Sequence, residues 1–264
     1  MKKVKLFILI LIAGLTVSFA QESVVKSAAA KAFWDRVHIG VKGGLTATNV
    51  NIDVRDTDLD DYDIPTAEKM NWRVGVDTKI DLFDAFFFKT GLEYINKGFN
   101  VDLDGFKKKF NDIKDIKGNW SVIYRYLEMP IHFGYDLGGF ELIAGPYLSY
   151  ALGGVENIDV EGTLSDNTTF DFSDNTDLQP VSGGSVNQDL PDDITGFVPD
   201  YFKSFDFGLT LGLGFKLDKF NIQVQYEQGF NNITPDFSQE PNFNPDDLQL
   251  KHNVLSVNVT YWIK

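Results

Sequence analysis

The chain of 264 residues contains no cysteine. This absence excludes a disulfide framework, a cysteine-based metal site and lipid attachment through an N-terminal cysteine. Basic residues are also scarce: 24 Lys and Arg stand against 38 Asp and Glu, which gives a formal net charge of −14. A surface of this sign repels the phosphates of nucleic acids, so we expect no nucleic-acid partner.

Long hydrophobic runs are missing everywhere except at the N-terminus. Residues 1–20 read MKKVKLFILILIAGLTVSFA, with three lysines ahead of an apolar run and small residues at Ser18 and Ala20. The run is shorter than the roughly 20 residues of a membrane-spanning helix, which favours a cleaved signal peptide over an uncleaved anchor. We therefore predict export with cleavage before Gln21, and a short N-terminal periplasmic leader over residues 21–36.

The rest of the chain is rich in alternating segments. In SFDFGLTLGLGFKL, residues 204–217, every second residue from Phe205 is large and apolar. A period of two is typical of a β-strand, because successive side chains point to opposite faces. Eight such segments occur, each about as long as a tilted strand that crosses a bilayer. They are residues 37–45, 72–80, 86–94, 124–135, 140–150, 205–217, 220–228 and 254–263.

The connections between these segments alternate between short and long. Tight links follow the second, fourth and sixth strands, at residues 81–84, 136–139 and 218–219. Long connections follow the odd strands, at residues 46–71, 95–123, 151–203 and 229–253. This layout predicts an all-β fold over residues 37–264: an eight-stranded antiparallel up-and-down transmembrane β-barrel with short periplasmic turns and long extracellular loops.

The alternative is a soluble, lipocalin-like barrel with its apolar rows inside. An eight-stranded barrel has an interior only wide enough to be filled by side chains. The apolar rows hold too many large aromatic residues for that space, whereas the opposite rows combine glycines with charged residues. We therefore expect the apolar rows to face lipid, which predicts an outer-membrane location.

The polar rows then define an interior ion network. Opposite charges of nearly equal number in a narrow interior must be paired. We accordingly expect a closed barrel without an open pore. The residues assigned to this network are Lys42, Arg73, Asp77, Lys79, Lys89, Glu93, Glu128, His132, Glu141, Asp206, Lys216 and Glu227.

Evidence for other chemistry is weak. Asp56, Asp58 and Asp60 have the spacing with which an EF-hand calcium loop begins. Asp61 and Ala67, however, stand where that loop needs Gly and Glu. Two interpretations therefore stay open, a loose Ca²⁺ or Mg²⁺ contact and a solvated acidic loop without a metal. No known hydrolase or metal-site motif accompanies the three histidines. We therefore expect a protein that is not an enzyme and has no cofactor. The acidic, Ser- and Asn-rich residues 151–203 are expected to be largely mobile.

Several phrases in the strands resemble one family. HIGVKGGLTATNV, TGLEYINKGF, YRYLEMPIHFGYDL, AGPYLSY and FDFGLTLGLGFKL followed by IQVQYEQGFNNI are similar, in this order, to the PorT-like outer-membrane β-barrel family of Bacteroidetes-type bacteria. The resemblance implies an eight-stranded outer-membrane barrel in a family whose members are mostly uncharacterised and whose founding member is tied to a protein-secretion system.

The expected function is therefore structural or partner-binding, with outer-membrane lipid and lipopolysaccharide around the barrel and an envelope protein partner at the long loops. Two alternatives stay open. One is an accessory component of a protein-secretion or nutrient-uptake complex. The other is a loop-based surface adhesin.

Overall fold

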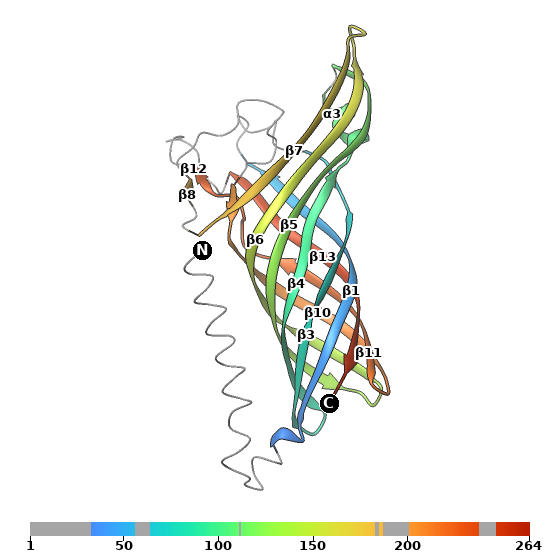
Figure 1. The fold of residues 1–264 in the computed structure, drawn as a ribbon, viewed down its shortest axis with the longest axis vertical. Coiled ribbons are helices and arrows are strands. Elements are labelled where there is room, and N and C mark those ends of the chain that lie inside the picture. The colour runs from blue at the N-terminus through green and yellow to red at the C-terminus, as the bar shows by residue number, and fades with distance from the viewer. Residues whose placement is uncertain (1–32, 56–63, 111, 183–184, 187–200, 238–246) are drawn as a thin grey trace.

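The computed structural model describes residues 33–55, 64–110, 112–182, 185–186, 201–237 and 247–264. Eight long strands pair in a closed antiparallel ring, which Figure 1 shows as a tilted barrel. In ring order they are β1 (Val37–Val54), β3 (Lys69–Phe83), β4 (Phe86–Val101), β5 (Ile113–Asp136), β6 (Phe140–Leu164), β10 (Phe205–Leu217), β11 (Phe220–Gly229) and β13 (Leu248–Trp262). The predicted eight-stranded barrel is confirmed.

The remaining elements lie near one end of the ring. We call this the loop end, and the other, where tight links join β3 to β4, β5 to β6 and β10 to β11, the short-turn end. The smaller elements are β2 (Thr66–Ala67), α3 (Leu103–Lys109), β7 (Thr169–Val181), β8 (Ser185–Val186), β9 (Tyr201–Lys203) and β12 (Asp236–Phe237). Among the described residues, no helix has the length and hydropathy to span a bilayer.

An apolar band surrounds the half of the barrel nearer the short-turn end. Leu45, Leu211 and Leu213 on this band are each more than 60% exposed, although they are large aliphatic residues. Aromatic side chains pair along both margins. Trp72 stacks on Tyr94 with ring centroids 5.3 Å apart at the margin nearer the loop end, and Phe220 contacts Tyr261 at 5.1 Å near the short-turn end. This arrangement is that of a lipid-facing band between two aromatic girdles.

Between the apolar band and the loop end, the apolar side chains of a strand point into the barrel and the polar ones point outward, the reverse of the pattern in the band. This reversal was not predicted from the sequence. In β1, Val41 and Leu45 point outward and Lys42 points inward, but farther along the strand Val50 is buried and Asn51 is exposed. The spacing stays at two while the apolar row changes face. The same strand therefore meets lipid at one end and water at the other, because the solvent outside the barrel changes along its axis.

This inversion corrects the expectation of long loops. The described part of residues 151–203, which is 151–182, 185–186 and 201–203, is mostly strand and not a largely mobile connection. In it β6 continues to Leu164, and β7 returns along β6 from Thr169 in an antiparallel ladder. Residues 95–123 likewise contain the end of β4, helix α3 and the first half of β5. Figure 1 shows β5, β6 and β7 rising past the other strands. We call residues 113–123, 155–164 and 169–178 the protruding sheet.

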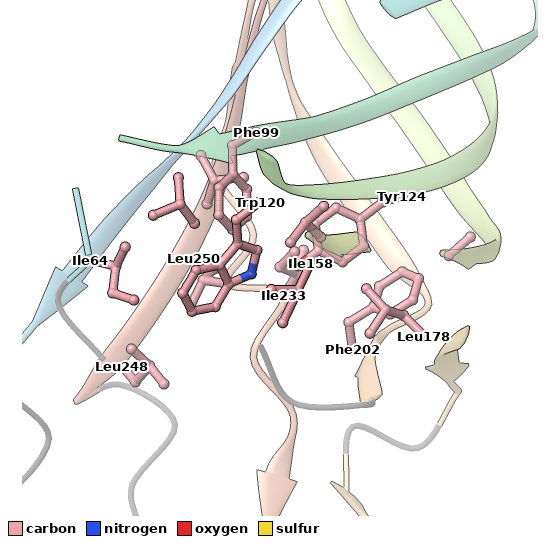
Figure 2. Close-up of a cluster of buried hydrophobic side chains, with 14 of the residues drawn as sticks. Ile64, Phe99, Trp120, Tyr124, Ile158, Leu178, Phe202, Ile233, Leu248 and Leu250 are labelled. Carbon is pink, nitrogen blue, oxygen red and sulfur yellow. The ribbon is translucent and has the colours of Figure 1, made fainter. Parts of the chain in front are cut away.

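An apolar cluster fills the barrel at the loop end and lines the inner face of the protruding sheet. Figure 2 shows its side chains converging from strands distant in the sequence. Tyr124 is fully buried here against Phe202, with ring centroids 4.8 Å apart. The cluster includes Ile64, Phe99, Trp120, Tyr124, Ile158, Leu178, Phe202, Ile233, Leu248 and Leu250.

Candidate functional site

The barrel interior within the apolar band is filled by charged and polar side chains. Nearest the short-turn end, Nζ of Lys79 lies 2.6 Å from Oε1 of Glu141 and 4.2 Å from the centre of the Phe87 ring. The second carboxylate oxygen of Glu141 accepts a hydrogen bond of 2.6 Å from Asn221 Nδ2. Both oxygens of this buried carboxylate are thus satisfied, as a buried charge requires.

The next layer contains a second lysine–carboxylate pair. Nζ of Lys89 lies 2.8 Å from Oδ2 of Asp77 and donates a hydrogen bond of 2.6 Å to Oε1 of Gln223. The hydroxyl of Thr260 also donates to Asp77, at 3.0 Å. Asp77 and Lys89 lie on the neighbouring strands β3 and β4, whereas Gln223 comes from β11 on the opposite side of the ring, so the hydrogen bond from Lys89 to Gln223 crosses the interior.

The centre of the barrel is occupied by Arg73, which faces three carboxylates. Its guanidinium nitrogens lie 2.6 Å from Glu227, 3.3 Å from Glu93 and 3.8 Å from Glu128. Lys42 pairs with the other oxygen of Glu93 at 2.6 Å. A planar guanidinium suits this position, because its five donors can serve several carboxylates at once.

The last layer before the apolar cluster is built on Lys97. Its Nζ atom lies 2.8 Å from Glu128 and 2.9 Å from Asp206, and 4.1 Å from the centre of the Tyr147 ring. The hydroxyl of Tyr147 donates to the same oxygen of Asp206 at 3.3 Å. Together the layers hold the cations of Lys42, Arg73, Lys79, Lys89 and Lys97 against the carboxylates of Asp77, Glu93, Glu128, Glu141, Asp206 and Glu227.

Eleven of the twelve residues assigned from sequence lie buried in this interior. His132 is among them, but neither of its ring nitrogens has a hydrogen-bond partner among the described residues. Lys97 was missed because it lies beyond residue 94, where the predicted strand stopped. The signal was present in the sequence, since Glu93, Ile95 and Lys97 continue the inward-facing row of β4.

Lys216 is the exception, and its assignment to the interior network is wrong. It lies at the short-turn end beyond the apolar band, where its side chain is 32% exposed and pairs with Asp136 on β5. Burial alone would raise the pKa of Asp136, but the hydrogen bonds from Lys216 and from the backbone amide of Gly138 together hold this pKa below its usual value. The alternation correctly placed Lys216 on the inward-facing row of β10. This end of the strand, however, extends beyond the filled interior.

The loop end is chemically different. His252 of β13 lies in the interior between Tyr124 and Tyr126 and shares a hydrogen bond of 3.2 Å with the hydroxyl of Tyr126. Nε1 of Trp120 donates to Glu156 at 2.7 Å. The hydroxyl of Tyr124 and Nδ1 of His252 are buried here without a hydrogen-bond partner among the described residues. The apolar cluster forms a second filled layer above the ion network.

The weak metal candidates Asp56, Asp58 and Asp60 lie outside the described residues. Within the residues that the structure does describe, no group of three or more His, Asp or Glu side chains is arranged to hold a metal ion. On the outer face of the protruding sheet, the polar side chains of Asn119, Asp159 and Asp171 are exposed.

The outer face of the protruding sheet is acidic and solvent-exposed. Paired positions across it include Lys117 with Glu161 and Glu161 with Asp171. Its tip is fixed by a tight turn in which the backbone amide of Thr168 donates to Asp166 at 2.8 Å. This hydrogen bond lowers the pKa of the exposed Asp166 carboxyl.

Comparison with known proteins gives one sequence family and several structures. A family described as "Outer membrane protein beta-barrel domain" matches residues 19–235. No curated protein matches the sequence.

Three solved structures illustrate the similarity of fold. Ail, the attachment invasion locus protein of Yersinia pestis, was solved with the heparin analogue sucrose octasulfate; it is 9% identical, with 86% of this chain and 99% of that chain covered and a TM-score of 0.39. Neisserial surface protein A is 8% identical, with 85% and 96% covered and a TM-score of 0.35. The outer membrane protease OmpT from Escherichia coli is 9% identical, with 87% and 97% covered and a TM-score of 0.30.

Proposed function

Because the chain belongs to the outer membrane β-barrel domain family, we propose that it is a non-enzymatic, non-conducting barrel that holds a rigid sheet outside the membrane for a protein partner. The observation that carries this proposal is the filling of the barrel in two successive layers. Charged pairs occupy the membrane half, and the apolar cluster occupies the half beyond it. Ions crossing such an interior would have to break buried ion pairs and then enter an apolar core.

The partner-binding part of the proposal is supported by the construction of the protruding sheet. In barrels of this kind the short turns face the periplasm and the longer connections face outward. The ladder of β5, β6 and β7 continues well beyond the apolar band, and Phe106 of α3 packs against Trp120 of β5 with ring centroids 5.6 Å apart. A packed sheet of this kind is a preformed surface, which lowers the entropic cost of binding.

The absence of enzymatic activity is supported by the positions of the histidines. His132 and His252 are buried inside the barrel, where a substrate in solution cannot reach them. His38 lies at the short-turn end, where its Nε2 atom contacts Asp81 at 2.8 Å.

The surroundings and route of the protein belong to the same proposal. The apolar band and its girdles suit outer-membrane lipid, with lipopolysaccharide around the outer margin. Export through a cleaved signal peptide is tested by N-terminal sequencing of the mature protein, for which we expect Gln21 as the first residue.

Planar-bilayer recording of the refolded protein tests the closed interior. We expect no stable channels, and channels of nanosiemens conductance would contradict the proposal. A photo-crosslinking residue in place of Asp159, on the outer face of β6, tests the platform in intact cells. We expect a discrete protein adduct at this position and none for the same residue in place of Gly138, which lies at the short-turn end. Adducts absent from both positions would refute the platform.

The identity of the adduct also separates the narrower functions. Another outer-membrane protein would indicate the accessory role in a secretion or uptake complex, which the resemblance to PorT-like sequences supports. A protein from outside the cell would indicate an adhesin.

A further inference from the structure

Strand β7 has one paired edge and one open edge. From Thr169 to Leu178 it pairs with β6. On its other side, β9 pairs with it only at Gln179, Pro180 and Val181. Among the described residues, no strand pairs with the open edge between Thr169 and Leu178. In Figure 1 this length of β7 forms the margin of the protruding sheet.

The register shows which backbone groups the open edge presents. At the turn, the amide of Leu164 donates to the carbonyl of Thr168 at 2.8 Å, so this pair is of the hydrogen-bonded type. Hydrogen-bonded pairs alternate along an antiparallel ladder. The even-numbered residues of β7 therefore bond to β6. The odd-numbered residues from Thr169 to Asp177, with Ser173 at their centre, turn their N–H and C=O groups to the open side.

The edge is held rigidly in place. The side chains of Phe170 and Phe172 on the inner face pack against the apolar cluster. Leu178 at the lower end of this stretch is 2% exposed and belongs to the same cluster. An incoming strand would therefore meet a template whose backbone is already extended and ordered, which favours strand addition.

Charge indicates what kind of strand would fit. The stretch TFDFSDNTDL contains Asp171, Asp174 and Asp177 and no Lys or Arg. A second copy of β7 would add its own aspartates to these, and charged residues on an edge are a common protection against self-association. An extended segment that carries Lys or Arg side chains would instead neutralise them.

We propose that the open edge of β7, from Thr169 to Asp177, takes an extended basic segment of a partner protein by β-strand addition. This inference rests on the proposed role of the protruding sheet and names the chemistry of its partner. It is separable from that role, because adducts at Asp159 would persist if partners used only the outer face of the sheet.

The test uses the full chain refolded in detergent and an octapeptide of alternating Lys and Thr as the probe. We expect binding in fluorescence anisotropy, and slower hydrogen–deuterium exchange at the amides of Ser173 and Asn175. An otherwise identical peptide with Glu in place of Lys should not bind. Equal binding of the two peptides, or no binding of either, would overturn the proposal.

A pair of variants isolates the backbone contribution. Ser173→Pro removes an amide that bonds to nothing in β6, and proline is tolerated on edge strands. We expect it to weaken binding of the Lys peptide about tenfold, whereas Ser173→Ala, which keeps the amide, should bind as the unaltered protein does. Unchanged binding by Ser173→Pro would refute strand addition. If this variant does not refold, an N-methylated Lys peptide supplies the same comparison, and full affinity of that peptide would likewise refute it.

Discussion

Lys97 on β4 places its Nζ atom 2.8 Å from Oε2 of Glu128 on β5 and 2.9 Å from Oδ2 of Asp206 on β10. All three side chains are fully buried, so one cation is shared by two carboxylates at the boundary between the ion network and the apolar cluster. In the ring β4 and β5 are neighbours, whereas β5 and β6 both lie between β4 and β10, and the contact of Lys97 with Asp206 joins residues 109 positions apart in the sequence.

Lys97→Met should lower the free energy of unfolding by about 3–5 kcal/mol, because it leaves the buried carboxylate of Asp206 without its cation and leaves Glu128 only the more distant Arg73. Lys216→Met is the matched control. It removes the same side-chain charge from a half-exposed pair with Asp136 at the short-turn end, and should cost about 1 kcal/mol or less. Urea titrations in lipid vesicles, followed by tryptophan fluorescence, measure both. Equal losses would mean that the interior is wetter than the burial of Lys97 indicates.

Leu211→Arg tests the lipid-facing band. Leu211 is 63% exposed on β10, in the middle of the apolar row, so a charge there would lie in the hydrocarbon. We expect a loss of about 2–4 kcal/mol in the same titration. Asp159→Arg, on the outer face of β6 beyond the band, should change stability by no more than about 0.5 kcal/mol. A large loss at Asp159 would place the membrane boundary higher than the inversion of the pattern indicates.

The membrane half of the barrel was predictable because its strands have lipid on one face and charged side chains on the other throughout that half. Lipid outside and charge inside give each strand a strict alternation, and β10 begins at Phe205 and ends at Leu217, as that alternation predicts. The interior direction of Arg73 and Glu128 follows from the same pattern, since a period of two fixes each side chain to one face.

The half beyond the membrane was missed because the contrast there is reversed. In β1 the apolar row passes from odd to even positions between Ala47 and Val50, so the odd-numbered row alone indicates that the strand ends there. The pairing of Lys97 with Asp206 was beyond sequence analysis for a different reason: it depends on the stagger of strands around the ring, which alternation alone does not determine.

Phe106→Ala tests whether the protruding sheet is a distinct cooperative unit. The Phe106 ring is 3% exposed and lies 4.5 Å from that of Phe110 and 5.6 Å from that of Trp120. Its removal should destabilise this region by about 3–5 kcal/mol. We expect faster hydrogen–deuterium exchange around Trp120, with amides in the membrane half unchanged, because local units open separately. Phe230→Ala, at a side chain that is 48% exposed, should leave both regions protected.

Gly134→Ala probes the fit of the interior near the short-turn end. A Cβ atom at Gly134 would overlap the ring of Phe87, which is 1% exposed. We expect Gly134→Ala alone to cost about 1–3 kcal/mol by overpacking, and Phe87→Ala alone about 3–5 kcal/mol by the cavity it leaves. In the double variant the new methyl group occupies part of that cavity, so its loss should be smaller than the sum of the two by at least about 0.5 kcal/mol.

Gly43 supplies the control for this cycle, because a Cβ atom there would meet no other atom within 4 Å. Gly43→Ala should be nearly neutral and additive with Phe87→Ala. Additive losses for Gly134 and Phe87 as well would show that the ring moves aside freely. The interior would then be loose enough to admit water beside Lys79, whose Nζ atom lies over the Phe87 ring, and the expectation of a closed barrel would lose its packing basis at this end.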